Sequence, residues 1–181
     1  MILKQILMIS SIVTGLSFSG NWKADTGNAK VTFTVKGLFG KVHGSFSGLQ
    51  STIQFNEKDL SGSSVSASVD AKTVSTGISL RNSDLRNKEE WFNTGKYPRI
   101  SFRSKKIEKT ANGYKALGDL TIKGITKSAE IPFTFTRKDA TGLFQGQFTI
   151  QRADYHLSKP GGSVGSVITV MLTVPVKDSS H

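Results

Sequence analysis

Apolar and polar residues alternate along most of the chain with the two-residue period of a β-strand. In residues 30–36, Val31, Phe33 and Val35 share one side while Thr and Lys residues take the other, which predicts a half-buried strand. Comparable runs follow at residues 46–55, 65–71, 100–102, 114–122, 129–135, 144–150 and 164–174. The chain therefore has the pattern of an all-β protein.

These runs predict about eight antiparallel strands joined by short turns of Gly, Asn and Asp. The phase of the alternation changes within residues 46–55, so we expect a bulge at Gly48 and Leu49. No segment of helical period is long enough to cover a sheet, and closure into a barrel would remove the exposed edges. A β-sandwich is the competing architecture, but the spacing of successive hairpins favours an antiparallel up-and-down β-barrel.

One polar insert, residues 79–93, interrupts the alternation. Asn87 and Glu90 resemble a capping box at the start of a helix. Leu85 and Phe92 are seven residues apart and would share one helical face. We therefore expect two short helical turns that cap one end of the barrel as a lid or plug.

A length of 181 residues fits one domain with a sizeable core. The chain has no cysteine, which excludes disulfides, a thiol nucleophile, an iron–sulfur cluster, a cysteine-ligated zinc site and an N-terminal lipid-modified cysteine. Abundant Gly and scarce Pro suit a turn-rich β fold.

The N-terminus has the pattern of a secretory signal peptide. Lys4 supplies a positive start, residues 6–18 a short apolar core, and Ser17 and Ser19 small residues spaced like a cleavage site. We predict a cleaved signal peptide at residues 1–19, one domain at residues 20–181, and a periplasmic location. An uncleaved N-terminal anchor is the alternative.

The formal net charge is +11 and the isoelectric point is near 10.0. Such a balance suits nucleic acid, an anionic membrane surface or acidic ligands, and export argues against nucleic acid. Lys30 and Lys36 fall on outward-facing strand positions. There, positive charge also keeps the protein soluble and prevents edge-to-edge pairing.

Motifs for catalysis, cofactors and metals are absent from the sequence. It contains no G-x-S-x-G and no Walker A sequence, and the glycines of residues 37–44 lead into no helix. His43, His156 and His181 are scattered without metal-ligand spacing. We therefore expect no enzyme, no cofactor and no metal site.

Phenylalanine is concentrated on the predicted inward face of the strands. The positions are Phe33, Phe46, Phe55, Phe102, Phe133, Phe135, Phe144 and Phe148. Such a face can form a filled core or line a cavity, since a barrel of about eight strands can hold one small ligand. Periodicity leaves both interpretations open.

The order of several motifs resembles the YceI-like family of exported, lipocalin-like, polyisoprenoid-binding proteins. The likeness extends from Trp22 to Val176. Its motifs are Trp22-Lys23-Ala24-Asp25, Val31-Thr32-Phe33-Thr34-Val35, Thr76-Gly77, Arg81-Asn82-Ser83-Asp84-Leu85, Glu90-Trp91-Phe92-Asn93, Tyr97-Pro98-Arg99-Ile100-Ser101-Phe102, the hairpin from Gly118 to Lys127, and Arg152-Ala153-Asp154-Tyr155. Asn82 and Asp84 depart from the family pattern, which has an acid and a histidine there.

The resemblance implies a lipocalin-like barrel whose apolar interior holds an amphiphile: a polyisoprenoid, a quinone-like molecule or a fatty amide. The implied cavity residues are Phe33, Val35, Phe46, Phe55, Val69, Phe92, Phe102, Leu120, Ile131, Phe133, Phe135, Phe148, Ile150, Val170 and Leu172. Arg81, Asp84 and Arg152 are the polar residues expected at a head group or on the lid, where Asp84 could pair with either arginine. About ten buried methylenes would supply roughly 8 kcal/mol before ordering costs, enough for about micromolar binding.

The leading hypothesis is an exported protein that binds such a lipid for transport, storage or sequestration. One alternative is an enzyme or redox partner acting on a quinone-like molecule, supported by Arg81, Asp84 and Arg152. The other is an adaptor whose positive charge binds anionic membrane or envelope polymers, with salt-sensitive association as its mark. A membrane surface and a second copy of the chain are further candidate partners, and no nucleic acid is expected.

Overall fold

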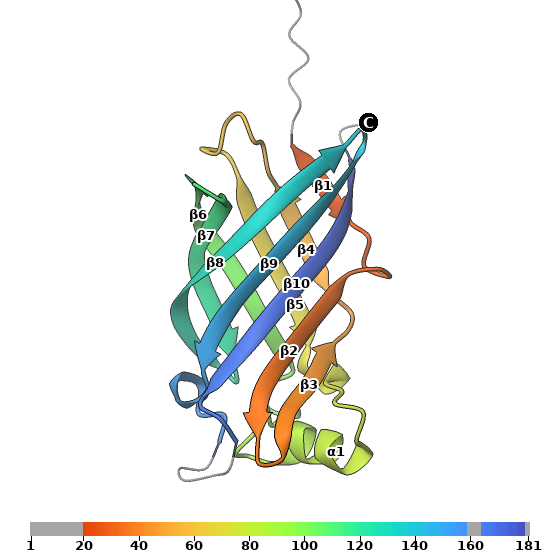
Figure 1. Ribbon diagram of the computed structural model, residues 1–181, viewed down its shortest axis with the longest axis vertical. Coiled ribbons are helices and arrows are strands. Elements are labelled where there is room, and N and C mark those ends of the chain that lie inside the picture. Colours follow the sequence, from red (N-terminus) through yellow and green to blue (C-terminus); the bar gives the residue numbers. More distant parts are fainter. Residues whose placement is uncertain (1–19, 159–163, 180–181) are drawn as a thin grey trace, which may run out of the picture.

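Ten strands form one antiparallel sheet in the computed structural model, which describes residues 20–158 and 164–179 (Figure 1). The strands are β1 (Asn21–Ala24), β2 (Lys30–Gly37), β3 (Gly40–Phe46), β4 (Gln50–Gln54), β5 (Ser64–Asp70), β6 (Arg99–Thr110), β7 (Gly113–Ile122), β8 (Ile125–Lys138), β9 (Thr141–Gln151) and β10 (Val167–Asp178). The predicted signal peptide at residues 1–19 lies outside the described residues.

The sheet closes into a barrel in which four short strands occupy two positions of the wall. β1 and β2 both pair with β10, with Ala24 opposite Val176 and Lys30 opposite Thr173. β4 pairs with β1, and β3 pairs with β2, so these two strands share the next position in the wall. The ten strands therefore occupy eight wall positions, which the chain visits in order. The prediction of an up-and-down barrel of about eight strands is confirmed.

The phase change predicted near Gly48 marks the break between β3 and β4. β3 ends at Phe46, β4 begins at Gln50, and Gly48 between them has a φ of +70°. A conformation with positive φ favours glycine. A bulge that the sequence did not suggest lies in β6 between Ser104 and Lys106, opposite Gly118. A Cβ at Gly118 would lie 2.2 Å from the carbonyl oxygen of Arg103, so the close approach of the two strands requires glycine.

The polar insert between β5 and β6 forms one helix and a series of turns. The short 3-10 helix η1 (Ala71–Thr73) leads to α1 (Ser79–Asn87), and Asn87 is the last residue of α1. The prediction of two helical turns, one of them starting at Asn87, is therefore wrong. The Asn82 side-chain oxygen accepts bonds from the backbone N–H and the hydroxyl of Thr76, both at 2.8 Å. This contact fixes the chain ahead of α1. Because Asn82 lies inside the helix and not at its first position, the contact is not a helix cap of the usual kind.

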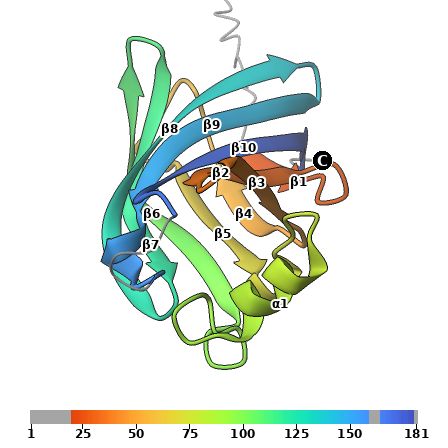
Figure 2. The same ribbon diagram turned by 60° about the horizontal axis from the view of Figure 1, so that its bottom comes forward.

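The insert lies at one end of the barrel, as predicted. Figure 1 shows α1 at the lower end, together with the turn between β2 and β3. Figure 2, turned toward that end, shows α1 and the turns that follow it along one side of the barrel's end. We call this the α1 end.

Aromatic side chains fill the opposite end of the barrel. This aromatic plug consists of Trp22, Phe55, Tyr114, Phe133, Phe135 and Phe144. The Phe55 ring lies at its centre, with ring centroids 4.9 Å from Tyr114 and 5.2 Å from Phe135. The Trp22 indole N–H donates to the Phe55 carbonyl oxygen at 3.0 Å, so its polar atom is satisfied.

Candidate functional site

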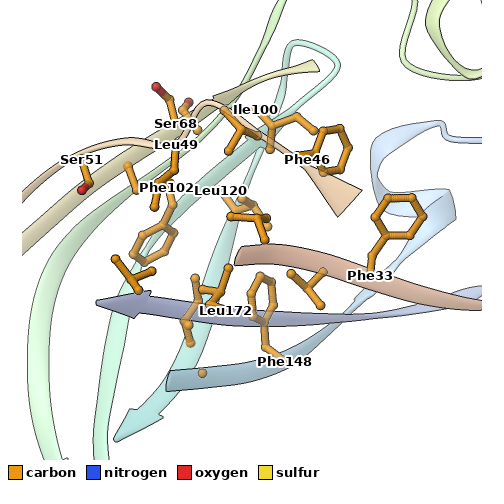
Figure 3. A pocket seen from close by; sticks show the side chains of 18 of the residues that line it. Phe33, Phe46, Leu49, Ser51, Ser68, Ile100, Phe102, Leu120, Phe148 and Leu172 are labelled. Carbon is orange, nitrogen blue, oxygen red and sulfur yellow. The ribbon is translucent and has the colours of Figure 1, made fainter. Parts of the chain in front are cut away.

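The barrel interior contains a cavity of about 210 Å³ between the aromatic plug and the α1 end. All eight wall positions contribute to its lining, as does the insert through Phe92. Figure 3 shows Phe33, Phe102 and Phe148 arranged around this space. The alternation of the strands explains the arrangement, because every second side chain of a barrel strand points inward.

The lining is apolar and contains no charged residue. Ser51 and Ser68 lie near Leu49 at one edge of the cavity (Figure 3), and the Ser68 hydroxyl oxygen accepts a bond from the exposed Arg99 at 3.0 Å. The Ser51 hydroxyl oxygen is buried and has no hydrogen-bond partner among the described residues. A large apolar cavity tends to stay free of water, and it binds apolar molecules. The site is therefore suited to a hydrocarbon tail.

Twelve of the fifteen residues predicted for the cavity line it. They are Phe33, Phe46, Val69, Phe92, Phe102, Leu120, Ile131, Phe133, Phe148, Ile150, Val170 and Leu172. The structure thus brings together side chains that are far apart in the sequence. Their contact with a ligand stays a prediction.

Phe55, Phe135 and Val35 do not line the cavity. Phe55 and Phe135 belong to the aromatic plug, where neighbouring rings occupy the space that a ligand would need. Val35 is buried where β2 pairs with its neighbours, opposite Ile168 and Val42. All three residues face inward as their strand phase requires, but they lie at levels of the barrel that side chains fill.

The cavity has further lining residues that sequence reasoning did not select. The apolar ones are Val31, Leu49, Ile53, Val65, Ala67, Ile100, Ala116, Ile122, Phe144, Leu157, Ile168 and Val174. Most could have been found from the same alternation, since Val31 is in phase with Phe33 and Ile100 with Phe102. Leu157 follows the 3-10 helix η2 (Arg152–Tyr155), where no strand period applies.

Three aromatic rings line the cavity where it meets the insert, and we call them the aromatic gate: Phe33, Phe46 and Phe92. Phe92 of the insert meets Phe46 edge-on at 5.5 Å, and Phe46 lies 5.6 Å from Phe33. The Phe33 ring rests on Gly44 of β3, where a Cβ would be 2.2 Å from its tip. Leu85 of α1 packs against the same core, but Phe92 lies beyond the end of α1, so the prediction that the two share one helical face is wrong.

The later part of the insert is fastened to the barrel. Lys123, in the turn between β7 and β8, donates to the carbonyl oxygens of Glu89 and His156. The Arg152 guanidinium lies over the Trp91 ring at 5.0 Å. These contacts hold the turns that carry Phe92.

Helix α1 itself is held less firmly. It buries no side chain. Arg86 donates to the Val74 carbonyl oxygen at 2.9 Å, and Leu85 accepts from the Phe92 N–H at 3.0 Å. Across the described residues, every hydrogen bond that leaves α1 ends within residues 74–94. The helix is therefore tied to its own insert and not to the barrel wall.

The predicted polar residues Arg81, Asp84 and Arg152 do not come together, and none of them lines the cavity. Asp84 forms an ion pair with Lys88 at 3.0 Å on the surface of α1, so the expected pairing with an arginine is wrong. Arg81 also lies on α1 and forms no hydrogen bond or ion pair with the other described residues. Both residues lie on the insert without contact to the cavity, and their role on a lid stays a prediction.

Arg152 is buried and bonded to the backbone, so its role is to stabilise the fold. It is only 4% exposed, and it donates to the carbonyl oxygens of Leu157, Val164 and Gly165 at 2.7–3.0 Å. Burial lowers the pKa of this guanidinium. Three carbonyl acceptors compensate the buried charge, and together they fasten the connection between β9 and β10.

Within the described parts of the chain, no three His, Asp or Glu side chains gather in a way that could hold a metal ion. In the same residues, no helix is long and apolar enough to cross a bilayer.

Comparisons with known proteins agree with the geometry. A family model described as the YceI-like domain matches residues 22–176. A UPF0312 protein of Yersinia enterocolitica is 29% identical over 154 residues, which cover 81% of this chain and 80% of the relative.

Solved structures show the same fold. The crystal structure of Burkholderia cenocepacia BcnA matches with a TM-score of 0.80 at 23% identity, over 84% of this chain and 99% of that one. A polyisoprenoid binding domain from Saccharophagus degradans, implicated in plant cell wall breakdown, matches with a TM-score of 0.69 at 17% identity, over 87% of this chain and 98% of that one. The lipocalin-like barrel predicted from the sequence is confirmed.

Proposed function

The chain belongs to the YceI-like family, and on that premise we propose that its barrel binds the apolar tail of an amphiphilic lipid. The ligand class is a polyisoprenoid, a quinone-like molecule or a fatty amide. The observation that carries this proposal is the apolar cavity inside the barrel, whose lining includes no charged residue. The description of the Saccharophagus degradans domain as polyisoprenoid binding supports it.

The size of the cavity limits what it holds in the observed conformation. Its volume of about 210 Å³ exceeds an apolar cavity of about 150 Å³ that binds benzene. It is below the range of about 300–1,000 Å³ for pockets of drug-sized ligands. The cavity therefore receives the end of a long tail. The rest of the chain and the head group would extend past the aromatic gate toward the α1 end.

Burial of the tail provides the affinity without any chemical step. Each methylene removed from water contributes about 0.8 kcal/mol of binding free energy, which offsets part of the cost of ordering the ligand. The alternative of a quinone-acting enzyme depended on Arg81, Asp84 and Arg152 forming one polar cluster, and these residues make separate contacts. We therefore propose binding without catalysis.

We also propose that the protein works in the periplasm, where it transports, stores or sequesters the lipid. The support is the signal-peptide pattern of residues 1–19. A water-filled compartment between two membranes is a place where a barrel that shields a lipid tail is useful.

A chain-length series tests the proposal. Delipidated protein is titrated calorimetrically with prenyl alcohols of five, ten and fifteen carbons. Affinity should rise with each five-carbon unit until the cavity is full and then level off, because only buried methylenes contribute. The absence of binding to any prenyl, quinone or acyl chain would contradict the proposal.

Ala116→Leu provides the site-specific arm. Ala116 is buried and lines the cavity, so added carbons would take the place of two or three ligand methylenes and weaken binding about 15- to 60-fold. Ala140→Leu, in the exposed turn between β8 and β9, is the matched control and should bind like the unaltered protein. Equal affinities in the two variants would show that the ligand lies elsewhere.

A further inference from the structure

Large apolar side chains that face solvent gather at the α1 end of the barrel. Leu38 and Phe39 form the turn between β2 and β3 and are 67% and 99% exposed. Ile78 and Leu80, at the start of α1, are 49% and 76% exposed. Figure 1 shows this turn and α1 at the same end. None of the four side chains lines the cavity, so the ligand site does not explain them.

The turn also carries positive charge. Lys36 and Lys41 stand directly opposite each other behind Leu38 and Phe39, and both are exposed. Neither forms an ion pair with a described residue, and the sequence has no acidic residue between Asp25 and Glu57. Like charges at directly opposed strand positions destabilise a sheet. Stability of the fold therefore accounts neither for the lysine pair nor for the exposed phenylalanine.

We propose that the α1 end docks on an anionic phospholipid bilayer. The docking surface consists of Leu38, Phe39, Ile78, Leu80, Lys36 and Lys41. The apolar side chains enter the boundary between head groups and acyl chains, and the lysines meet the lipid phosphates. Apolar insertion combined with cationic contacts is the usual means by which a protein without a spanning segment binds a membrane surface.

A bilayer fits this surface better than a protein partner does. The turn between β2 and β3 lies beside α1 at the barrel end (Figure 1), and only two apolar side chains of this turn are exposed, whereas a stable protein interface needs about 800 Å² from each partner. A fluid bilayer accepts such small apolar groups without a preformed pocket. The lysine pair adds attraction to an anionic surface, whereas the same pair on a second copy of this chain would repel it.

Docking in this orientation has a consequence for the cavity. The aromatic gate and the insert lie at the same end as the docking surface, and the aromatic plug lies at the other end. The bound protein would therefore present its gated end to the lipid. This inference goes beyond lipid binding in the cavity, since either can hold without the other.

Vesicle co-sedimentation tests the inference. Purified protein without the predicted signal peptide, residues 20–181, is mixed in delipidated form with vesicles of phosphatidylglycerol and phosphatidylcholine, or of phosphatidylcholine alone. We expect binding to the anionic vesicles that weakens with added salt. Leu38→Ser with Phe39→Ser should weaken it by at least about tenfold, because two apolar side chains no longer leave water. Met171→Ser, at another exposed apolar position on the barrel wall, should have no effect.

A second pair of variants separates this surface from general charge attraction. One double variant, Lys36→Gln with Lys41→Gln, removes two exposed cations from the α1 end. The other, Lys109→Gln with Lys138→Gln, removes two exposed cations from the opposite half of the barrel. Only the first pair should weaken vesicle binding. Equal losses in both, or unchanged binding of the Leu38/Phe39 variant, would overturn the proposal. A dimer that dissociates in the Leu38/Phe39 variant while vesicle binding persists would assign the surface to a second copy, against the proposal.

Titration of the same variants with a short prenyl alcohol distinguishes the two functions. Unchanged cavity binding in a variant that has lost vesicle binding is the expected result. Cavity binding that falls in parallel with vesicle binding would contradict a separate docking surface.

Discussion

The two ends of the barrel are built in opposite ways. At one end the aromatic plug brings six rings into mutual contact, and its central residue Phe55 is only 2% exposed. At the other end α1 buries no side chain, and the turn between β2 and β3 leaves Phe39 in solvent. Both ends are rich in apolar residues, but the α1 end also leaves several of them in solvent.

This contrast indicates where the barrel can open. A segment with few buried apolar contacts opens at a lower free energy than the core strands do. The insert contributes Phe92 to the cavity lining, and Leu85 packs against the same core, while its helix is bonded within residues 74–94. We therefore expect the plug end to be the fixed base of the cavity and the α1 end to be its entrance.

Hydrogen exchange should show the largest difference between the two regions. We expect amides of α1 to exchange roughly a thousandfold faster than those of Phe102 in β6 and Phe133 in β8. Local opening costs little at an exposed helix, whereas core strands open only with global unfolding. A bound prenyl alcohol should slow exchange in α1. Protection of α1 equal to that of the strands would make the insert a structural plug.

A pair of phenylalanine substitutions should separate the ends in stability. Phe55→Ala should lower the free energy of unfolding by about 3–5 kcal/mol, because it leaves a void among packed rings. Phe39→Ala should change it by less than about 0.5 kcal/mol, because the side chain is in solvent. Urea denaturation measures both. A small effect of Phe55→Ala would mean that the plug end relaxes easily and is no fixed base.

Loosening the entrance should affect kinetics more than stability. Leu85→Ala combined with Phe92→Ala should speed release of a bound prenyl alcohol about tenfold and leave the barrel folded, because both side chains belong to the insert. Stopped-flow displacement measures the rate, and circular dichroism checks the fold. If the double variant keeps the release rate of the unaltered protein, the insert has no part in ligand exit.

Much of the barrel could be predicted because one physical rule governs it. Inward and outward positions alternate along every strand, so Val31 and Phe33 or Ile100 and Phe102 could be assigned from spacing alone. The same rule cannot tell which inward positions face empty space. Phe55 and Phe148 both face inward, yet rings surround the first and the second lines the cavity. That distinction depends on side chains across the barrel, which periodicity does not contain.

The insert was the least predictable part. Its helix begins at Ser79 without a side-chain cap and ends at Asn87, where a capping sequence suggested a start. The contact of Asn82 with Thr76 decides the local path, and such contacts follow no periodic pattern. The role of Arg152 was missed for a similar reason, since its carbonyl partners Leu157, Val164 and Gly165 have no recognisable motif.

The most direct test of the central claim, that the cavity holds a lipid tail, is native mass spectrometry of the purified protein followed by organic extraction. We predict one bound amphiphile for each barrel, recovered by extraction as a molecule with a prenyl, quinone or acyl tail. The Ala116→Leu variant should carry less of it, because its cavity is smaller. A mass equal to that of the bare chain, with no uptake when such lipids are added, would contradict the claim.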